Sequence, residues 1–363
     1  MRTDLFDYRL PPELIALHPA SRRDGSRLLV LAPDGNLACA GFDGLPGLLP
    51  RRSLLVANDT RVIPARLRGR RPTGGAVELL LVREVETGGD HCRWTALASA
   101  NKPLRPGDEI DFGGPRAEIV ERGERGEVLV RIDLGSAGFR EHVAAAGEVP
   151  LPPYLRRSPE PDDRTRYQTV FAREDGSVAA PTAGLHFTPE LMERLVRGGH
   201  ELAMLTLHVG PGTFRPIVAD DLAGHAMDSE RYAIPAATVA MIRAARDEGR
   251  PVIAVGTTVV RALEGAAVAN GGWLEPGAGE TALFIAPPFE FCVIDGLLTN
   301  FHLPRSTLLC LVAALAGREH VLAAYEWAVA KRMRFYSYGD AMLILPRGRR
   351  ATEGTAGRSV GVA

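Results

Sequence analysis

The chain has 363 residues, a formal net charge of -1 and a hydrophobic content of 45%. This length is sufficient for two domains, or for one large domain that carries an insertion. No apolar run is long enough to span a bilayer, and no apolar signal-peptide core follows the first residues. We therefore expect a cytoplasmic protein that does not associate with membranes. The 4 cysteines are widely spaced, which favours isolated reduced thiols over disulfides or a zinc site.

The first part of the chain predicts a short helix at 10–16 and a buried strand at 53–57 that ends in a polar turn. The texture then changes to short, alternating runs separated by Gly and Pro, which predict a small β-barrel or sandwich. These predicted strands are 76–84, 91–98, 109–112, 117–121 and 127–132. A short helix at 142–147 and a proline-rich connector at 149–154 follow them.

From about residue 176 the pattern becomes α/β. Strands are predicted at 201–208, 252–255, 282–285, 292–295 and 341–345, and helices at 236–248, 259–269, 307–316 and 321–331. Ser306 is the predicted cap of the helix at 307–316. Helices that alternate with strands predict a sheet covered on both faces. The expected organisation is a discontinuous body of residues 1–62 and 150–345, an inserted domain at 63–149, and a disordered tail at 346–363.

Clusters of small residues, hydroxyls and histidines adjoin several predicted strand or helix ends. They are residues 176–188, 206–215, 225–230, 256–261 and 298–304. The first cluster runs into a helix start, where Thr188 suits the N-cap and Pro189 the first helical position. Ligands of open α/β sheets collect beyond the carboxyl ends of the strands. Each cluster taken alone fits an ordinary cap or a structural histidine equally well, so the residues by themselves predict only a polar cleft.

Arginines crowd the region 51–71, where Asp59 is the one acidic residue. Such a run favours a polyanionic partner, but an arginine-rich coding bias would produce much the same surface. The two interpretations have equal weight at this stage.

The same clusters, in this order, resemble the S-adenosylmethionine:tRNA ribosyltransferase-isomerase family of queuosine biosynthesis. The resemblance is carried by long motifs such as NDTRVIPARL at 58–67, GSVAAPTAGLHFT at 176–188, LTNFHLP at 298–304 and RFYSYGDAM at 334–342. Further motifs lie at 7–16, 23–28, 74–80, 150–154, 166–171 and 255–258. Together they extend over nearly the whole chain.

The resemblance implies a three-layer α/β/α body with a mixed sheet and an inserted small β-barrel domain. It also implies transfer and isomerisation of the ribosyl part of S-adenosylmethionine onto 7-aminomethyl-7-deazaguanine at the wobble position of tRNA. The products are epoxyqueuosine-tRNA, adenine and methionine. The expected partners are the tRNA anticodon stem-loop and S-adenosylmethionine, which is consumed as a co-substrate, so neither a metal nor another cofactor is expected.

This chemistry needs a base for a C5′ hydrogen and a proton donor for adenine, and histidine suits both roles near neutral pH. The candidate catalytic residues are His186, His208, His225 and His302, with Glu230 and Asp340 as orienting or cation-stabilising carboxylates. The candidate substrate-binding residues are Thr182, Gly184, Gly210, Gly212, Thr213, Arg215, Gly256, Thr257, Thr258, Arg261 and Asn300. The candidate tRNA-binding residues are Asn58, Arg61, Arg66, Arg68, Arg70 and Arg71.

One position departs from the family pattern, which has a second histidine where this chain has Asp228. If that histidine is catalytic, this protein would be slower, or a paralogue that transfers the ribosyl group to a free small-molecule deazapurine. If it only packs, little changes. A non-catalytic RNA-binding module is a third hypothesis, supported by the arginine run alone.

Overall fold

The computed structural model describes residues 1–214 and 216–346, and the chain forms two compact units. The first unit contains residues 1–59, 169–172 and 181 onward, and the second contains residues 60–168 and 173–180. Residues 150–168 and 173–180, which the sequence assigned to the body, thus pack with the inserted segment. Arg215 and the predicted disordered tail beyond residue 346 lie outside the described residues.

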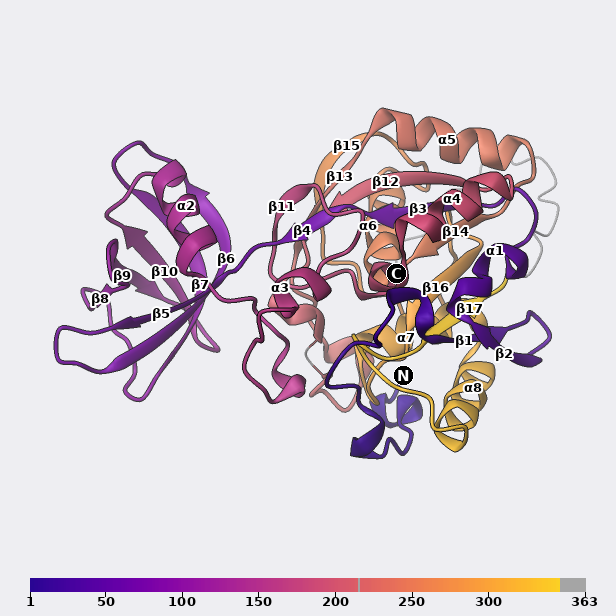
Figure 1. The fold of residues 1–363 in the computed structure, drawn as a ribbon, viewed down its shortest axis with the longest axis horizontal. Coiled ribbons are helices and arrows are strands. Elements are labelled where there is room, and N and C mark those ends of the chain that lie inside the picture. Colours follow the sequence, from indigo (N-terminus) through magenta and orange to yellow (C-terminus); the bar gives the residue numbers. More distant parts are fainter. Residues whose placement is uncertain (215, 347–363) are drawn as a thin grey trace. The chain divides into compact units, whose positions relative to one another are not determined.

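The first unit is built on a nine-stranded mixed sheet of order β15-β13-β12-β3-β14-β16-β17-β1-β2 (Figure 1). Its strands are β1 (Arg27–Leu31), β2 (Leu37–Gly41), β3 (Leu54–Asn58), β12 (Glu201–Leu207), β13 (Glu230–Ile234), β14 (Val252–Val255), β15 (Gly277–Thr281), β16 (Gly296–Asn300) and β17 (Ala341–Ile344). The four strands β12, β3, β14 and β16 run parallel to one another. β13 and β17 run antiparallel to this central group.

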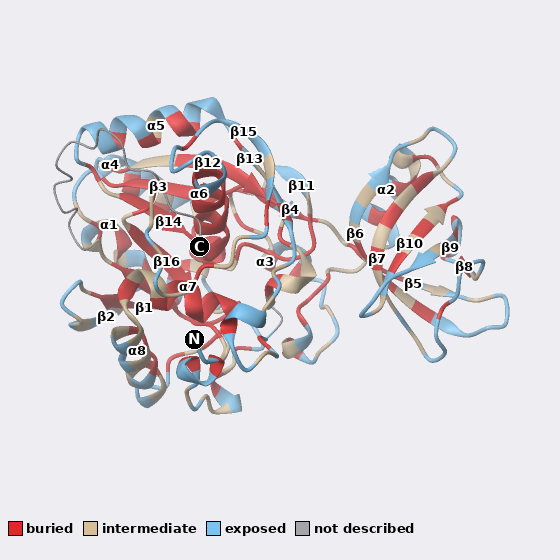
Figure 2. Cartoon of the chain, turned by 180° about the vertical axis from the view of Figure 1, so that it is seen from behind, coloured by how far each residue is buried: buried red, intermediate tan, exposed pale blue. Residues whose placement is uncertain are grey.

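Helices cover both faces of the sheet. They are α1 (Leu45–Leu48), α4 (Pro189–Arg197), α5 (Ala236–Asp247), α6 (Thr257–Ala269), α7 (Thr307–Ala316) and α8 (Arg318–Ala330). Leu55 and Ala57 of β3 share one core cluster with Leu191 of α4. The alternating residues Leu54 and Val56 are equally buried and point to the opposite face, because successive strand side chains alternate. Figure 2 shows α6 buried along most of its length and α5 with an exposed outer face, which confirms the predicted layered α/β body.

Two helix starts form as the sequence predicts. The Thr188 hydroxyl accepts a hydrogen bond from the Leu191 N–H at 3.1 Å and begins α4. The Ser306 hydroxyl accepts one from the Leu309 N–H at 3.2 Å and begins α7. Both caps satisfy an N–H that has no partner inside its helix.

Several sheet elements differ from the sequence prediction. The strands expected at 282–285 and 292–295 lie instead at β15 and β16, and β1, β2 and β13 were not expected. β15 is glycine-rich and lacks apolar alternation, so its pairing with β13 defines it as a strand. Residues 10–16 form only a 3-10 turn at Pro12–Leu14. The other 3-10 turns are η1 (Thr3–Phe6), η3 (Arg23–Gly25), η4 (Phe42–Gly44), η5 (Pro153–Leu155), η6 (Thr182–His186), η7 (Pro211–Phe214) and η8 (Leu222–Gly224).

The second unit contains a closed barrel of strand order β10-β7-β6-β5-β8-β9, which confirms the inserted β-barrel. Its strands are β5 (Arg66–Arg70), β6 (Ala76–Glu86), β7 (Cys92–Ala100), β8 (Glu109–Asp111), β9 (Arg116–Arg122) and β10 (Glu127–Ile132). Leu79, Trp94 and Val130 fill its interior together with Phe139 of α2 (Ser136–Ala146). β4 (Thr60–Val62) and β11 (Glu174–Ser177) pair in parallel, and α3 (Asp163–Arg166) also belongs to this unit.

Within the described ranges, no single helix has the length and apolar composition needed to cross a membrane. The bent pair α7 and α8, at 116° to each other, meets this requirement only when both helices are taken together.

Candidate active site

One edge of the nine-stranded sheet collects most of the polar segments that the sequence singled out. The parallel strands β12, β3, β14 and β16 end at this edge, and the antiparallel strands β13, β17 and β1 begin there. The residues at or just beyond the strand ends are therefore Glu230, His208, Thr257, Asn300 and Asp340, in spatial order along the edge. Distant segments of the chain thus form one polar rim.

The rim is too long for all candidate residues to act on one atom. Neighbouring strands are about 4.8 Å apart, so the five steps from β13 to β17 separate Glu230 from Asp340 by about 24 Å. The two carboxylates consequently belong to different clusters. We describe the rim from the β13 end to the β1 end.

At the β13 end, Glu230 is buried and holds the 210–213 loop. One carboxylate oxygen accepts hydrogen bonds from the Gly210 N–H at 3.1 Å and from the Thr213 hydroxyl at 2.5 Å. The other oxygen forms an ion pair with Arg261 of α6, which also donates to the carbonyls of Asp228 and Thr281. Every oxygen of Glu230 is thus bonded within the protein, so this carboxylate positions the loop in the structure seen here.

At two positions of the rim, steric constraints explain why the residue is glycine. A Cβ atom on Gly212 would lie 1.8 Å from a carboxylate oxygen of Asp228, so any other residue here would require the Asp228 side chain to move. Gly256 has a φ of 97° between β14 and α6, in the region that glycine adopts without strain. Asp228, the position that departs from the family pattern, therefore packs directly against the loop that Glu230 holds.

In the centre of the rim, Asn58 ties three elements together. Its amide accepts from the Leu207 N–H at 3.1 Å and donates to the Leu207 carbonyl at 2.9 Å and to the Thr258 hydroxyl at 3.3 Å. It is 2% exposed, so it belongs to the interior of the first unit rather than to a surface that contacts phosphates. The adjacent Asp59 accepts a hydrogen bond from the Thr206 hydroxyl at 2.7 Å. The sequence prediction missed Asp59, although it directly follows the buried strand β3.

His186 lies in η6 and has both ring nitrogens engaged. Nδ1 is 2.8 Å from the Ser26 hydroxyl, Nε2 is 3.1 Å from the amide nitrogen of Asn300, and the ring stacks on Phe42. The Asn300 amide also donates to the carbonyl of Tyr336, whose φ of 75° is a strained left-handed conformation. Because the amide donates to Nε2, the tautomer with a proton on Nδ1 fits this network. Burial lowers the pKa of His186 to about 4, so the ring is neutral at pH 7.

His302, just beyond β16, is also buried. Its ring Nε2 is 2.9 Å from the Thr299 hydroxyl. Its backbone N–H donates to the Tyr325 hydroxyl at 3.1 Å, and its backbone carbonyl accepts from the Tyr8 hydroxyl at 2.5 Å. Burial lowers its pKa to about 3. The ring is therefore neutral under physiological conditions, and the backbone of His302 joins the N-terminal segment to α8 through Tyr8 and Tyr325.

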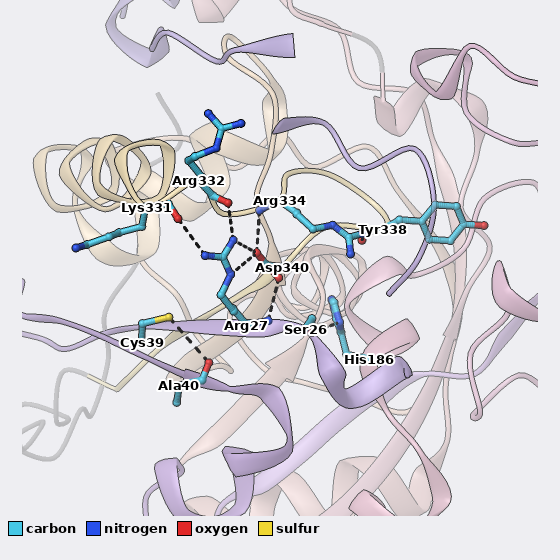
Figure 3. A network of polar contacts seen from close by, with 10 residues as sticks. All are labelled: Ser26, Arg27, Cys39, Ala40, His186, Lys331, Arg332, Arg334, Tyr338 and Asp340. Atoms are coloured by element: carbon cyan, nitrogen blue, oxygen red, sulfur yellow. Dashed lines mark hydrogen bonds and ion pairs between the residues drawn. The ribbon is translucent and has the colours of Figure 1, made fainter. Parts of the chain in front are cut away.

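At the β1 end, Asp340 organises the chain around Arg27, as Figure 3 shows. Its carboxylate accepts from the backbone N–H groups of Arg27 at 2.9 Å and Arg334 at 2.8 Å, and from the Arg27 side chain at 3.1 Å. The same guanidinium donates to the carbonyls of Lys331 and Arg332. Asp340 thus fixes the 331–340 segment against β1. The sequence prediction missed Ser26 and Arg27, whose one signal was the 23–28 motif.

His208 and His225 are half-buried, in contrast to His186 and His302. His208 follows β12, and its N–H donates to the Arg231 carbonyl at 2.9 Å. The ring of His225 contacts Phe284 edge to face at 5.4 Å. Both residues lie on segments next to β13, so they are at the same end of the rim as Glu230.

The remaining predicted residues are divided between buried positions and the second unit. Thr182 is half-buried at the start of η6, whereas a Cβ atom on Gly184 would lie 2.9 Å from Thr169, so Gly184 serves close packing. All five predicted tRNA-binding arginines belong to the second unit, namely Arg61, Arg66, Arg68, Arg70 and Arg71. Among the residues that the structure describes, no group of three or more His, Cys, Asp or Glu side chains could hold a metal ion.

The depressed pKa of His186 predicts an acid-sensitive fold. The unfolded chain binds this proton near pH 6.5 and the folded chain near pH 4, so the stabilisation is complete above pH 6.5 and is lost as the pH falls to about 4. The loss from this residue is about 3 kcal/mol. We expect His186→Asn to be less stable at pH 7 but to lose less unfolding free energy between pH 7 and pH 4, measured by urea denaturation. His18→Asn, at an exposed position, is the matched control, and equal pH dependence in the wild type and His186→Asn would contradict the assignment.

Comparisons with known proteins agree with the fold and with the family resemblance. Residues 3–344 match the family described as Queuosine biosynthesis protein. Proteins named S-adenosylmethionine:tRNA ribosyltransferase-isomerase are 51% identical in Anaeromyxobacter sp. (strain Fw109-5), over 95% of this chain and 99% of the relative, and in Syntrophotalea carbinolica, over 95% and 100%. The crystal structure of S-adenosylmethionine tRNA ribosyltransferase from Thermotoga maritima is 37% identical, covers 94% of this chain and 100% of its own, and has a TM-score of 0.53. The chain belongs to the queuosine biosynthesis protein family of S-adenosylmethionine:tRNA ribosyltransferase-isomerases.

Proposed function

We propose that this protein transfers the ribosyl part of S-adenosylmethionine to 7-aminomethyl-7-deazaguanine at the tRNA wobble position and isomerises it to epoxyqueuosine. The observation that carries the proposal is the match to enzymes of this name along nearly the full length of both chains. S-adenosylmethionine is consumed as a co-substrate, and the proposal needs no metal or other cofactor. The anticodon stem-loop is the proposed part of the tRNA, and the cytoplasm, where tRNA is modified, is the proposed location.

The reaction places definite demands on the rim. The sulfonium acidifies the neighbouring C5′ hydrogens, so a base removes one of them as adenine leaves with a proton from an acid. The unprotonated amine of the tRNA base then attacks the opened sugar, and methionine leaves as the epoxide closes. Groups that accept and donate protons must therefore be accessible to substrate and able to change charge near neutral pH.

The environments of the histidines favour the β13 end of the rim for these proton transfers. His186 and His302 are buried, neutral and bonded within the protein. His208 and His225 are half-buried and lie at the same end of the rim as the 210–213 loop that Glu230 holds. We assign proton transfer to His208 and His225, and donor binding to the 210–213 loop and the start of α6.

The reaction itself is tested with an anticodon stem-loop that carries the aminomethyl-deazaguanine base. We expect the wild-type protein to release adenine and methionine from S-adenosylmethionine and to add the ribosyl mass to the RNA, as measured by mass spectrometry. The free base serves as the alternative acceptor. Modification of the free base but not of the RNA would favour the small-molecule paralogue, and failure to release adenine with either acceptor would favour a non-catalytic RNA-binding protein.

The assignment of the histidines predicts a selective loss of activity. His208→Ala or His225→Ala should lower adenine release by about 100-fold or more, because a positioned acid or base contributes about 10²- to 10⁴-fold. His320→Ala, a half-buried histidine on α8, is the control and should be near wild type. Near-normal rates in both variants would refute the assignment.

Glu230 is expected to act as a positioning residue. Glu230→Gln keeps one oxygen for Gly210 and Thr213 but removes the charge that faces Arg261. We expect the KM for S-adenosylmethionine to rise about tenfold or more, since about 1.4 kcal/mol of lost binding corresponds to a factor of 10. The limbs of the pH-rate profile should stay in place. Glu280→Gln on β15 is the exposed control. If Glu230→Gln instead removes one limb of the pH-rate profile and lowers kcat about 10³-fold, Glu230 is a proton-transfer group.

A further inference from the structure

The barrel of the second unit has a narrow closure. β5 and β8 are joined by one residue pair, Arg70 opposite Asp111, whereas β5 and β6 pair along all of β5. A groove of about 1220 Å³ lies at this seam, between the β5–β6 turn, the β8–β9 turn and the end of β7. Typical small-molecule pockets occupy about 300–1,000 Å³, so the groove is large for a single nucleotide. We call it the seam groove.

Two arginines line the seam groove from strands that lie on either side of β8. Arg70 of β5 is opposite Asp111 of β8, which is in turn opposite Arg116 of β9. Residues in direct register on antiparallel strands project to the same side of a sheet. The two guanidinium groups therefore originate about 10 Å apart, two strand spacings, on one exposed face.

Neither of these two cations forms an ion pair among the residues that the structure describes. Arg70 donates only to the carbonyl of Gly74, and Arg116 has no ion pair among residues 1–214 and 216–346. Asp111, which lies between them in register, instead accepts a hydrogen bond from the Gly113 N–H at 2.7 Å. Both guanidinium groups thus keep donors that can bind an anion from solution.

The other arginines between residues 61 and 71 have acidic partners. Arg61 pairs with Asp175, Arg66 with Glu78, Arg68 with Glu78 and Glu148, and Arg71 with Asp108. An exposed cation that already faces a carboxylate gains less from a phosphate, because the phosphate must displace or tolerate that acid. The electrostatic footprint is therefore narrower than the arginine run in the sequence suggests.

The chemistry of the seam groove favours a phosphodiester strand. Guanidinium groups bind phosphate oxygens through paired N–H donors, and two such groups on a rigid barrel can hold more than one phosphate. Ser99 and Asn101 add neutral hydrogen-bonding groups to the lining. Glu78, Glu109 and Asp111 also line the groove and repel phosphate, so the phosphates are expected to lie against the guanidinium groups of Arg70 and Arg116.

We infer that the seam groove binds the sugar-phosphate backbone of tRNA, and that Arg70 and Arg116 are its phosphate contacts. The inference rests on the proposed function, because it takes tRNA as the polyanion. It adds Arg116, from a strand outside the arginine run, and it removes Arg61, Arg66, Arg68 and Arg71 from the set of primary contacts.

The test compares Arg70→Ala/Arg116→Ala with the wild type in binding and turnover of full-length tRNA at several salt concentrations. Each lost phosphate contact lowers the slope of log K against log[salt] by about 0.7 to 0.9, so we expect the double variant to lose about 1.5 from the slope. The KM for tRNA should rise, while kcat at saturating tRNA and the KM for S-adenosylmethionine stay unchanged. Both side chains are exposed, so the fold should persist and is checked by thermal denaturation.

Arg122→Ala is the matched control. Arg122 is an exposed arginine at the other end of β9, six residues from Arg116, or about 20 Å along the strand. If the salt slope of the double variant equals that of Arg122→Ala, the inference is refuted, provided that the wild type modifies tRNA. A wild type that binds tRNA but does not modify it would instead refute the proposed function. The salt slopes would then still show whether tRNA binds at the seam groove.

Discussion

The parallel alignment of β12, β3, β14 and β16 is the constraint on which the candidate active site depends. Every residue of β3 and β14 is buried, because α4 packs on one face of the sheet and α5 and α6 on the other. Polar groups cannot remain unpaired inside these layers, so they collect where the strands end. The alignment thus converts segments that are far apart in sequence into one rim, as is general for ligand sites of open α/β sheets.

The rim is held by buried charges whose partners are supplied by the protein. The ion pair of Glu230 and Arg261 links the start of β13 to α6, and Asp340 links β1 to the segment after α8. Losing one member of such a pair leaves an uncompensated buried charge, which costs about 3–5 kcal/mol. Two histidines of the rim are instead kept neutral by burial. The same kind of side chain is therefore fully buried at one position of the rim and half-buried at another.

The second unit is stabilised by the closure of its barrel. A closed barrel removes exposed strand edges, and its core of Leu79, Trp94 and Val130 is continuous. Its closure between β5 and β8 is nevertheless limited to one pair, which leaves space for a groove. Of the four arginines that line it, Arg68 and Arg71 are paired with acids, whereas Arg70 and Arg116 are not. Unpaired cations, rather than the number of arginines, consequently define the surface that can attract a nucleic acid.

The sequence by itself determined the α/β body, the inserted barrel, the caps of α4 and α7, and the family, because these follow from local patterns and long contiguous motifs. It did not determine β15, which lacks apolar alternation and forms through pairing with β13. Nor could it separate His208 from His186, since burial is a property of the packed layers and not of a residue's neighbours in the chain. Only the tertiary structure decided which arginines have acidic partners, because Glu148 and Asp175 approach Arg68 and Arg61 across long stretches of sequence. Contacts between distant segments set burial and charge pairing, and these two quantities decide the chemical role of each side chain.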